Sequence, residues 1–254
     1  MNELKMKEKS IRLQKIIANS GFCSRREAEK YIFNSKVKVN NKIAKIGQLA
    51  SYDDKIEINN QLISFNNFKL VYFLLNKPKK TISSAKDPQK RTTVVDLIKT
   101  DQRIVPVGRL DYNTTGALLL TNDLNLVNKL THPKYQIIRV YRARINIPLT
   151  LKEFKEINRG IIVNGKISHQ IVDQVADKSY LIQLHVGSYH HIKELFKYFN
   201  REVINLKRIS YANLTVEKMP EGSYRSLKIK EIKDLKRLVR EQENKLNLNN
   251  EKQN

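Results

Sequence analysis

The feature that most restricts what this chain can fold into is a run of short strand patterns between residues 69 and 231. Few helical patterns interrupt this run, whereas parallel βαβ units need a helix after nearly every strand. The pattern therefore predicts an α+β domain built on a mixed, mainly antiparallel β-sheet with flanking helices. The strand segments are KLVYFLL, IVPVG, RVYRARINI, GIIVNGKI, QIVDQVA, YLIQLHV, VINLKRISYANL and SYRSLKI.

Two segments of this domain carry residues that matter later. In RVYRARINI, alternation places Tyr141 on an apolar face with Ala143, Ile145 and Ile147, so spacing alone makes Tyr141 a core residue. In HHIKELFKYF, Lys193 lies beside an apolar helical stripe, and spacing alone makes it one surface lysine among many. That stripe consists of Ile192, Leu195, Phe196 and Phe199.

A smaller unit is predicted for residues 11–68. The segment IRLQKIIANSGFCSRREAEKYIF contains two short helical patterns, and the second opens at Ser24 with Glu27 at capping-box spacing. Short strands follow, with Asn40-Asn41 suited to a tight hairpin. Residues 1–10 are expected to be flexible. Residues 232–254 are expected to form a charged, solvated helix that frays into an Asn-rich tail.

The net charge of the chain indicates which class of molecule it binds. The 254 residues include 48 Lys and Arg against 25 Asp and Glu, which gives a formal net charge of +23. An excess of this size favours a polyanion, and nucleic acid before an anionic membrane surface. The alternative is a compositional bias toward Lys, Asn and Ile without selection for charge.

Other sequence features point to the cytoplasm. The single cysteine, Cys23, excludes an internal disulfide, which suits a reducing compartment. No apolar run approaches the length of a membrane helix, and the charged first residues lack the apolar core of a signal peptide. We therefore expect a cytoplasmic protein that does not insert into membranes.

The segment RLQKIIANSGFCSRREAEKYI, followed by VKVN, closely resembles the S4 RNA-binding module over residues 11–68. The resemblance implies a small domain of two helices and a sheet whose basic side chains contact phosphates. Ser35 and Asn41 stand where the family usually has glycine, and Asn tolerates left-handed geometry better than Ser. A solvated helix start is the alternative for Arg25 and Arg26. The expected RNA-binding residues of this unit are Arg12, Lys15, Arg25, Arg26 and Lys30.

The string GRLDYNTTGALLLTND places a carboxylate, Asp111, between Arg109 and an apolar run. From spacing alone, a turn residue paired with Arg109 and a reactive carboxylate facing a cleft are equally supported. The string resembles the catalytic motif of RsuA/RluB-type ribosomal RNA pseudouridine synthases, which join an S4 module to a catalytic domain. Supporting segments occur in the family's order: NKPKKTISSAKDPQKRTTVVDLI, HPKYQIIRVYRARI, GSYHHIKELFKYFNREVINLKRISYANLTV and EGSYRSL.

Resemblance to that family implies conversion of uridine in RNA to pseudouridine without a cofactor or metal, in a catalytic domain at residues 69–231. Asp111 matches the catalytic aspartate, Tyr141 the active-site tyrosine, and Lys193 the basic residue that keeps the aspartate ionised. Arg109, Thr115 and Arg139 are expected to bind the substrate nucleotide. Lys77 and Lys79, in a polar basic loop, are expected to contact RNA.

The late motif departs most from the family pattern. The family commonly reads Glu-Gly-Arg-x-x-Gln-(Val or Ile)-basic-basic-(Met or Leu)-Phe, where this chain has VGSYHHIKELF. Lys193 retains the basic position, and His190-His191 lack the carboxylate spacing of a metal site. We expect a monomeric enzyme acting on ribosomal RNA or an assembly intermediate, with the large subunit preferred. A non-catalytic RNA-binding or ribosome-assembly protein of the same fold is the alternative.

Overall fold

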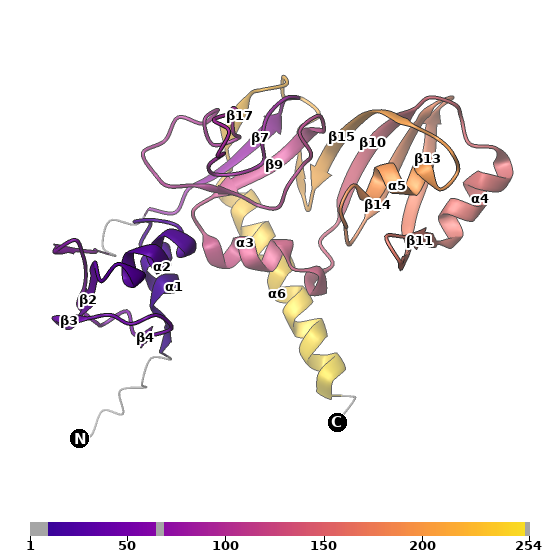
Figure 1. The fold of residues 1–254 in the computed structure, drawn as a ribbon. Helices are drawn as coiled ribbons and strands as arrows, with labels where there is room; N and C mark the ends of the chain where they lie inside the picture. Colours follow the sequence, from indigo (N-terminus) through magenta and orange to yellow (C-terminus); the bar gives the residue numbers. More distant parts are fainter. Residues whose placement is uncertain (1–9, 65–68, 252–254) are drawn as a thin grey trace. The chain divides into compact units, whose positions relative to one another are not determined.

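The computed structural model describes residues 10–64 and 69–251 and contains two compact units (Figure 1). The first unit ends at Leu70 and also includes Asp101–Arg103, and the second comprises Val71–Thr100 and the chain from Ile104 onward. The predicted flexible N-terminus lies outside the described residues except for Ser10. Within the described ranges, no helix is long and apolar enough to cross a membrane.

The first unit packs two helices, α1 (Leu13–Asn19) and α2 (Arg25–Phe33), against short strands. Leu13, Ile16 and Ile17 are fully buried, as their helical spacing predicts. The Ser24 hydroxyl accepts a hydrogen bond from the Glu27 amide and caps α2. The strands form a sheet of order β3-β2-β5-β6 and a separate β1-β4 pair; they are β1 (Ile11–Arg12), β2 (Val37–Val39), β3 (Lys42–Ile43), β4 (Leu49–Ala50), β5 (Ile56–Ile58) and β6 (Gln61–Leu62).

The turns of this unit follow the asparagine pattern of the sequence. Asn40 and Asn41, between β2 and β3, have φ angles of 49° and 67°. Ser35, just after α2, has a φ of 56°. A left-handed backbone is uncommon for a residue other than Gly, Asn or Asp, so Ser35 occupies a strained position where a glycine would fit without strain.

The second unit is built on a mixed sheet in which nine described strands take part. Its main path runs β13-β14-β10-β15-β9-β7-β17, with β16 on β15 and β8 on β9. Neighbours along this path are antiparallel except β9 and β15, which are parallel. The expected α+β fold with a mainly antiparallel sheet is confirmed. The strands are β7 (Tyr72–Lys77), β8 (Val105–Pro106), β9 (Thr115–Thr121), β10 (Arg139–Ile145), β13 (Gln170–Ala176), β14 (Ser179–Leu184), β15 (Val203–Tyr211), β16 (Leu214–Thr215) and β17 (Tyr224–Ser226).

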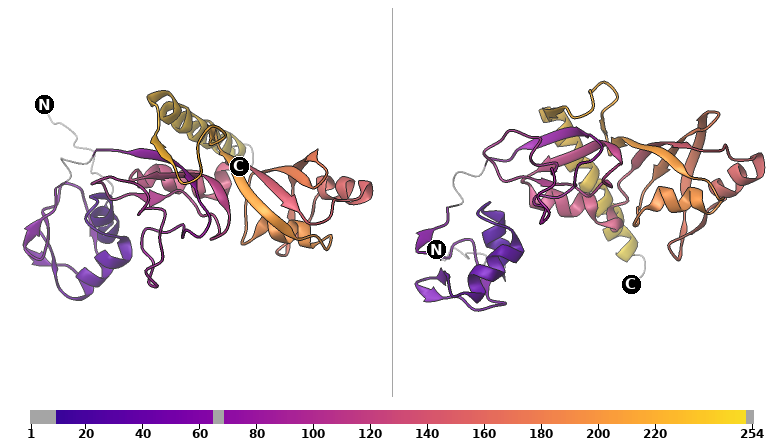
Figure 2. Two further views of the ribbon diagram at one scale, coloured as in Figure 1. Left: turned by 90° about the horizontal axis from the view of Figure 1, so that it is seen from above. Right: turned by 45° about the horizontal axis from the view of Figure 1, so that its top comes forward.

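Helices cover both faces of this sheet. On one face, α3 (Leu124–Thr131) and α6 (Ile229–Glu251) pack with η1 (Pro133–Tyr135) against residues such as Leu74 and Leu119. On the other face lie α5 (His191–Lys197), α4 (Leu151–Arg159), the β11 (Ile161–Val163) and β12 (Lys166–Ser168) hairpin, and the loop before β8. Figure 2 shows α6 and α5 on opposite sides of the sheet.

Two expectations about this unit are wrong. The C-terminal helix starts at Ile229 and buries Leu235 and Val239 completely or nearly so, therefore it is part of the core and not a solvated tail. The strand at RVYRARINI ends at Ile145, and Ile147 is exposed. The apolar stripe at Ile192, Leu195, Phe196 and Phe199 is buried as expected.

Candidate active site

Asp111 lies in the loop between β8 and β9, and buried contacts hold this loop from both sides. The preceding residue, Leu110, is packed in the core, and its backbone exchanges two hydrogen bonds with the hydroxyl of Ser83, at 2.8 and 3.1 Å. The Asp111 carbonyl accepts a hydrogen bond from the Thr114 amide, which closes the turn after it. The side chain of Asp111 is one-third exposed, so its carboxylate is fixed in position yet accessible.

Lys77, the last residue of β7, holds the same loop in place. Its ammonium lies within hydrogen-bond distance of the carbonyl oxygens of Pro78, Asp111, Tyr112 and Thr114, at 2.9 to 3.3 Å. The side chain is completely buried because β7 continues through this residue and pairs it with Gly116. The expectation that Lys77 contacts RNA is therefore wrong; it positions the Asp111 loop instead.

Two basic side chains on or beside α5 face the Asp111 carboxylate. Lys193 Nζ lies 3.1 Å from Asp111 Oδ2, and His190 Nε2 lies 3.6 Å from the same oxygen. Burial of Leu195 and Phe196 anchors α5 on the sheet, which directs Lys193 toward Asp111. The carboxylate therefore pairs with Lys193 and not with Arg109, the partner that the turn interpretation required.

Tyr141, on β10, joins Asp111 and Lys193 in one small cavity. Its ring is half-buried and packs against core residues on either side. The guanidinium of Arg208 lies 6.0 Å from the centre of this ring, on a side chain that is almost completely buried. The structure thus brings together the three residues expected to be catalytic, from three separate segments of the chain.

The two halves of the sheet that carry these residues meet at Gly116. Its φ is +110°, and a Cβ there would overlap the backbone of Arg208, its partner on β15. Only glycine allows β9 to approach β15 this closely. The glycine in the TTGALLLT segment therefore sets the separation between the Asp111 loop and Tyr141.

Of the three residues expected to bind the substrate nucleotide, Arg109 and Arg139 line cavities around Asp111. Arg109 is exposed, lines the cavities around Asp111 and has no ion-pair partner among the described residues. Arg139 lines one of these cavities and donates to the His185 carbonyl at 3.0 Å. Thr114 lines the cavity that contains Asp111, whereas Thr115, the first residue of β9, does not. The substrate contact expected of Thr115 stays a prediction.

Sequence reasoning missed a hydrogen-bonded cluster behind the site. His191 contacts the hydroxyls of Ser168 and Ser188, at 2.8 and 2.9 Å, and burial lowers the pKa of its imidazole. The cluster ties the start of α5 to the β12 strand. Its only sequence signal is the pair of adjacent histidines. Within the part of the chain that the structure describes, no group of three or more His, Cys, Asp or Glu residues is placed to hold a metal ion.

The basic residues expected to contact RNA in the first unit are all exposed. Arg12 donates to the Gly47 carbonyl, which fixes its side chain along the surface. In the second unit, Lys79 is exposed and donates to the Asn205 side chain at 2.8 Å. The exposed residues of the first unit are Arg12, Lys15, Arg25, Arg26 and Lys30.

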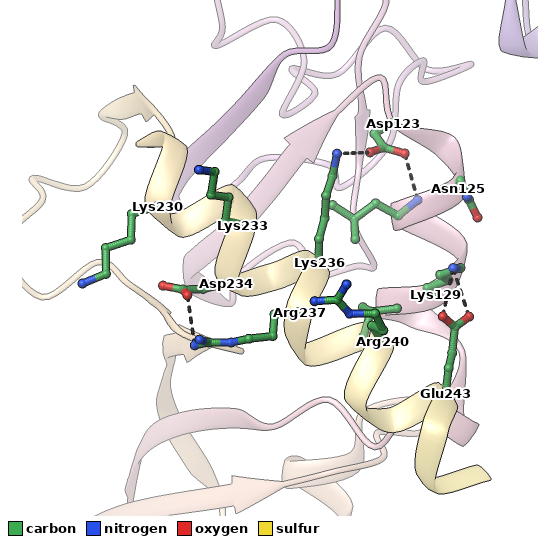
Figure 3. Close-up of a pocket in the computed structure, with 12 residues that line it drawn as sticks. Asp123, Asn125, Lys129, Lys230, Lys233, Asp234, Lys236, Arg237, Arg240 and Glu243 are labelled. Atoms are coloured by element: carbon green, nitrogen blue, oxygen red, sulfur yellow. Dashed lines mark hydrogen bonds and ion pairs between the residues drawn. The ribbon is translucent and has the colours of Figure 1, made fainter. Parts of the chain in front are cut away.

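A larger cavity, of about 780 Å³, lies between α3 and α6 (Figure 3). Acidic residues neutralise several of its bases: Lys129 pairs with Glu243 at 3.0 Å, and Arg237 pairs with Asp234 at 3.0 Å. This cavity is on the sheet face opposite α5, away from Asp111. The Lys129–Glu243 pair joins α3 to α6, whereas the Arg237–Asp234 pair lies within α6.

Comparison with known proteins identifies the family. A family model described as RNA pseudouridylate synthase matches residues 71–248. The chain belongs to the RNA pseudouridylate synthase family. An S4 domain model matches residues 11–51 of the same chain. The resemblance recognised in the sequence is confirmed, and the protein is an RNA pseudouridine synthase with an N-terminal S4 domain.

Relatives of this pseudouridine synthase align over nearly its whole length. The chain is 40% identical over 237 residues to ribosomal large subunit pseudouridine synthase B of Bacillus subtilis (strain 168), covering 90% of this chain and 96% of that protein. It is 32% identical over 234 residues to the dual-specificity RNA pseudouridine synthase RluF of Escherichia coli (strain K12), covering 91% and 80%. A crystal structure of a pseudouridylate synthase superimposes with a TM-score of 0.66 at 29% identity, covering 89% and 100%.

Proposed function

We propose that this protein isomerises a specific uridine of ribosomal RNA to pseudouridine, with the RNA of the large subunit as preferred substrate. The B. subtilis relative is named for the large ribosomal subunit, which supports this choice. The observation that carries the proposal is the Asp111 carboxylate, held in a cavity by Lys193 at 3.1 Å beside the ring of Tyr141. The enzyme acts as a cytoplasmic monomer on the RNA or on an assembly intermediate.

The reaction exchanges one bond to the ribose for another. The bond between uracil N1 and the ribose C1′ breaks, the base turns, and C5 bonds to C1′; C5 loses a proton and N1 gains one, so no atom is added or removed. An ionised Asp111 serves as nucleophile or stabilises a cationic sugar. Lys193 orients the carboxylate through the 3.1 Å contact, and Tyr141 packs against the base and assists removal of the C5 proton.

Binding energy from basic residues supports the extrusion of the target nucleotide. Unstacking a base costs a few kcal/mol, which contacts to phosphates offset. Arg109 is exposed and without an ion-pair partner among the described residues, so it can hold the extruded nucleotide or fill the space it leaves. Arg139 supports the nucleotide from β10. The exposed bases of the S4 domain and Lys79 supply further phosphate contacts.

Chemical mapping of pseudouridine in ribosomal RNA tests the proposal. Cells with the wild-type protein, with Asp111→Asn and without the protein are compared. We expect one or a few large-subunit positions to be modified with the wild type and unmodified in the other two strains. Identical maps from all three strains would show that the protein does not modify ribosomal RNA.

Purified variants of the Lys193 position extend the same test. Lys193→Met leaves Asp111 without its closest cation and is expected to lower kcat by about 100-fold or more, whereas Lys193→Arg retains the charge and much of the rate. Lys197→Met, one turn further along α5 and largely exposed, is the matched control. Equal rates for Lys193→Met and Lys197→Met would contradict the assigned role of Lys193.

A further inference from the structure

Tyr189 presents a large aromatic ring to solvent next to the proposed active site. Its side chain is 78% exposed, so it contributes little to the packing of the fold. The ring stacks on that of His190, with 3.9 Å between centroids and 22° between planes. The Tyr189 ring therefore has one face against His190 and the other face open to solvent.

Hydrogen bonds from the Asn164 side chain and the backbone conformation of His190 hold this pair in place. The side-chain amide of Asn164, in the β11–β12 hairpin, donates to the Tyr189 carbonyl at 2.9 Å and to the Ser188 hydroxyl at 2.7 Å. His190 has a left-handed backbone with a φ of 50°. Asn, Asp and His adopt this left-handed conformation more readily than other residues with a side chain, so His190 fits the turn that orients its ring.

The pair lies directly against the proposed reaction centre. His190 Nε2 is 3.6 Å from the Asp111 carboxylate. Tyr189, His190 and Asp111 together line two cavities of about 510 and 440 Å³, and Arg109 lines both. An open aromatic face, a cation and a reactive carboxylate thus share one surface.

We propose that the Tyr189–His190 pair is a stacking platform for the unpaired base adjacent to the target uridine, an inference that rests on the proposed function. Proteins bind single-stranded RNA by stacking splayed bases on exposed aromatic rings. The Asp111–Tyr141 cavity receives the extruded uridine, and Tyr189 stacks with a neighbouring base once the RNA has opened. The contact tolerates any base, because every base offers a π-face.

Variants of Tyr189, each assayed on RNAs with and without the neighbouring base, test the platform. The substrates are an RNA stem-loop carrying the mapped uridine and two versions of it that lack the base of the nucleotide on the 5′ or the 3′ side. The full-length wild type, Tyr189→Phe and Tyr189→Ala are assayed for KM and kcat of pseudouridine formation. On the intact RNA we expect Tyr189→Ala to raise KM by about 5- to 150-fold and Tyr189→Phe to stay within about twofold of the wild type.

The abasic substrates separate stacking from a structural role. Loss of the base on one side should remove most of the difference between wild type and Tyr189→Ala, because the ring then has no stacking partner. Tyr198→Ala, which removes a half-exposed tyrosine beyond α5, is the matched control and should leave KM unchanged. An equal Tyr189→Ala effect on all three RNAs, or no effect on any, would overturn the platform. Absence of product from the wild type would instead overturn the proposed function, and the platform with it.

Discussion

At the scale of single residues, Lys77 shows how a buried charge is used to build a site. Burial lowers the pKa of its ammonium to about 8, although Asp111 and Glu221 act in the opposite direction. The charge is tolerated because carbonyl oxygens of the Asp111 loop surround it. Burying the charge of Lys77 costs free energy of folding. The hydrogen bonds of its ammonium offset this cost and fix the loop that carries the proposed nucleophile.

This balance predicts a pH dependence of stability. In the unfolded chain Lys77 has its ordinary pKa of 10.5, so between pH 8 and pH 10.5 the unfolded state binds more protons than the folded state. The free energy of unfolding of the wild type should therefore rise relative to that of Lys77→Met as the pH increases from 8 toward 10.5. Urea unfolding at a series of pH values measures the difference.

The matched control is Lys79→Met, which removes an exposed lysine two residues further along the chain. Its unfolding free energy should run parallel to that of the wild type over the same pH range. A difference between wild type and Lys77→Met that does not change with pH would show that Lys77 titrates alike in the folded and unfolded states.

At the scale of elements, α6 is the part of the chain whose composition misleads most. Its sequence is dominated by charged residues, a pattern typical of a solvated helix. Yet Leu235 and Val239 lie one turn apart and are buried against the sheet with Leu126 and Leu130 of α3. Ile232 and Leu238 of α6 pack against the same cluster, and ion pairs between α6 and α3 lie beside it (Figure 3).

Truncation of one buried leucine tests this role. Leu235→Ala should lower the free energy of unfolding by about 2 to 5 kcal/mol, since it removes a fully buried side chain and leaves a cavity. Leu248→Ala, on the exposed part of the same helix, should change it by no more than about 0.5 kcal/mol. Equal, small effects in urea unfolding would mean that α6 does not contribute to the core.

At the scale of the whole molecule, the net charge of +23 and the two units suit a protein that opens structured RNA. The S4 domain carries exposed arginines at the start of α2, where no side chain is needed for packing. Contacts of this kind give affinity without sequence information. We expect the unit that contains Asp111 to select the uridine.

Salt dependence measures the contribution of the S4 domain. The affinity for a large-subunit RNA fragment should fall steeply with added salt, and the full-length double variant Arg25→Gln/Arg26→Gln should reduce the steepness of log K against log salt by roughly 1 to 2. The control Lys152→Gln/Lys155→Gln removes the same charge from α4 and should leave the slope unchanged. Equal slopes for the two double variants would assign no RNA contact to Arg25 and Arg26.

Local patterns in the sequence determined the elements, and resemblance to a known family singled out the main site residues. Helical spacing identified Leu13, Ile16 and Ile17 as buried, and strand runs predicted the α+β class. Resemblance of the motifs to those of the pseudouridine synthase family singled out Asp111, Tyr141 and Lys193. These features depend on neighbours along the chain or on short motifs, which can be read without coordinates.

Only the tertiary structure decided which way the remaining side chains face. Lys77 and Thr115 are buried because β7 and β9 are inner strands of the sheet and both faces of the sheet are covered there. His190 reaches Asp111 because α5 packs on a face of the sheet, and α6 joins the core because its few apolar residues meet α3. Each of these outcomes depends on contacts between residues far apart in the chain, and no local pattern records them.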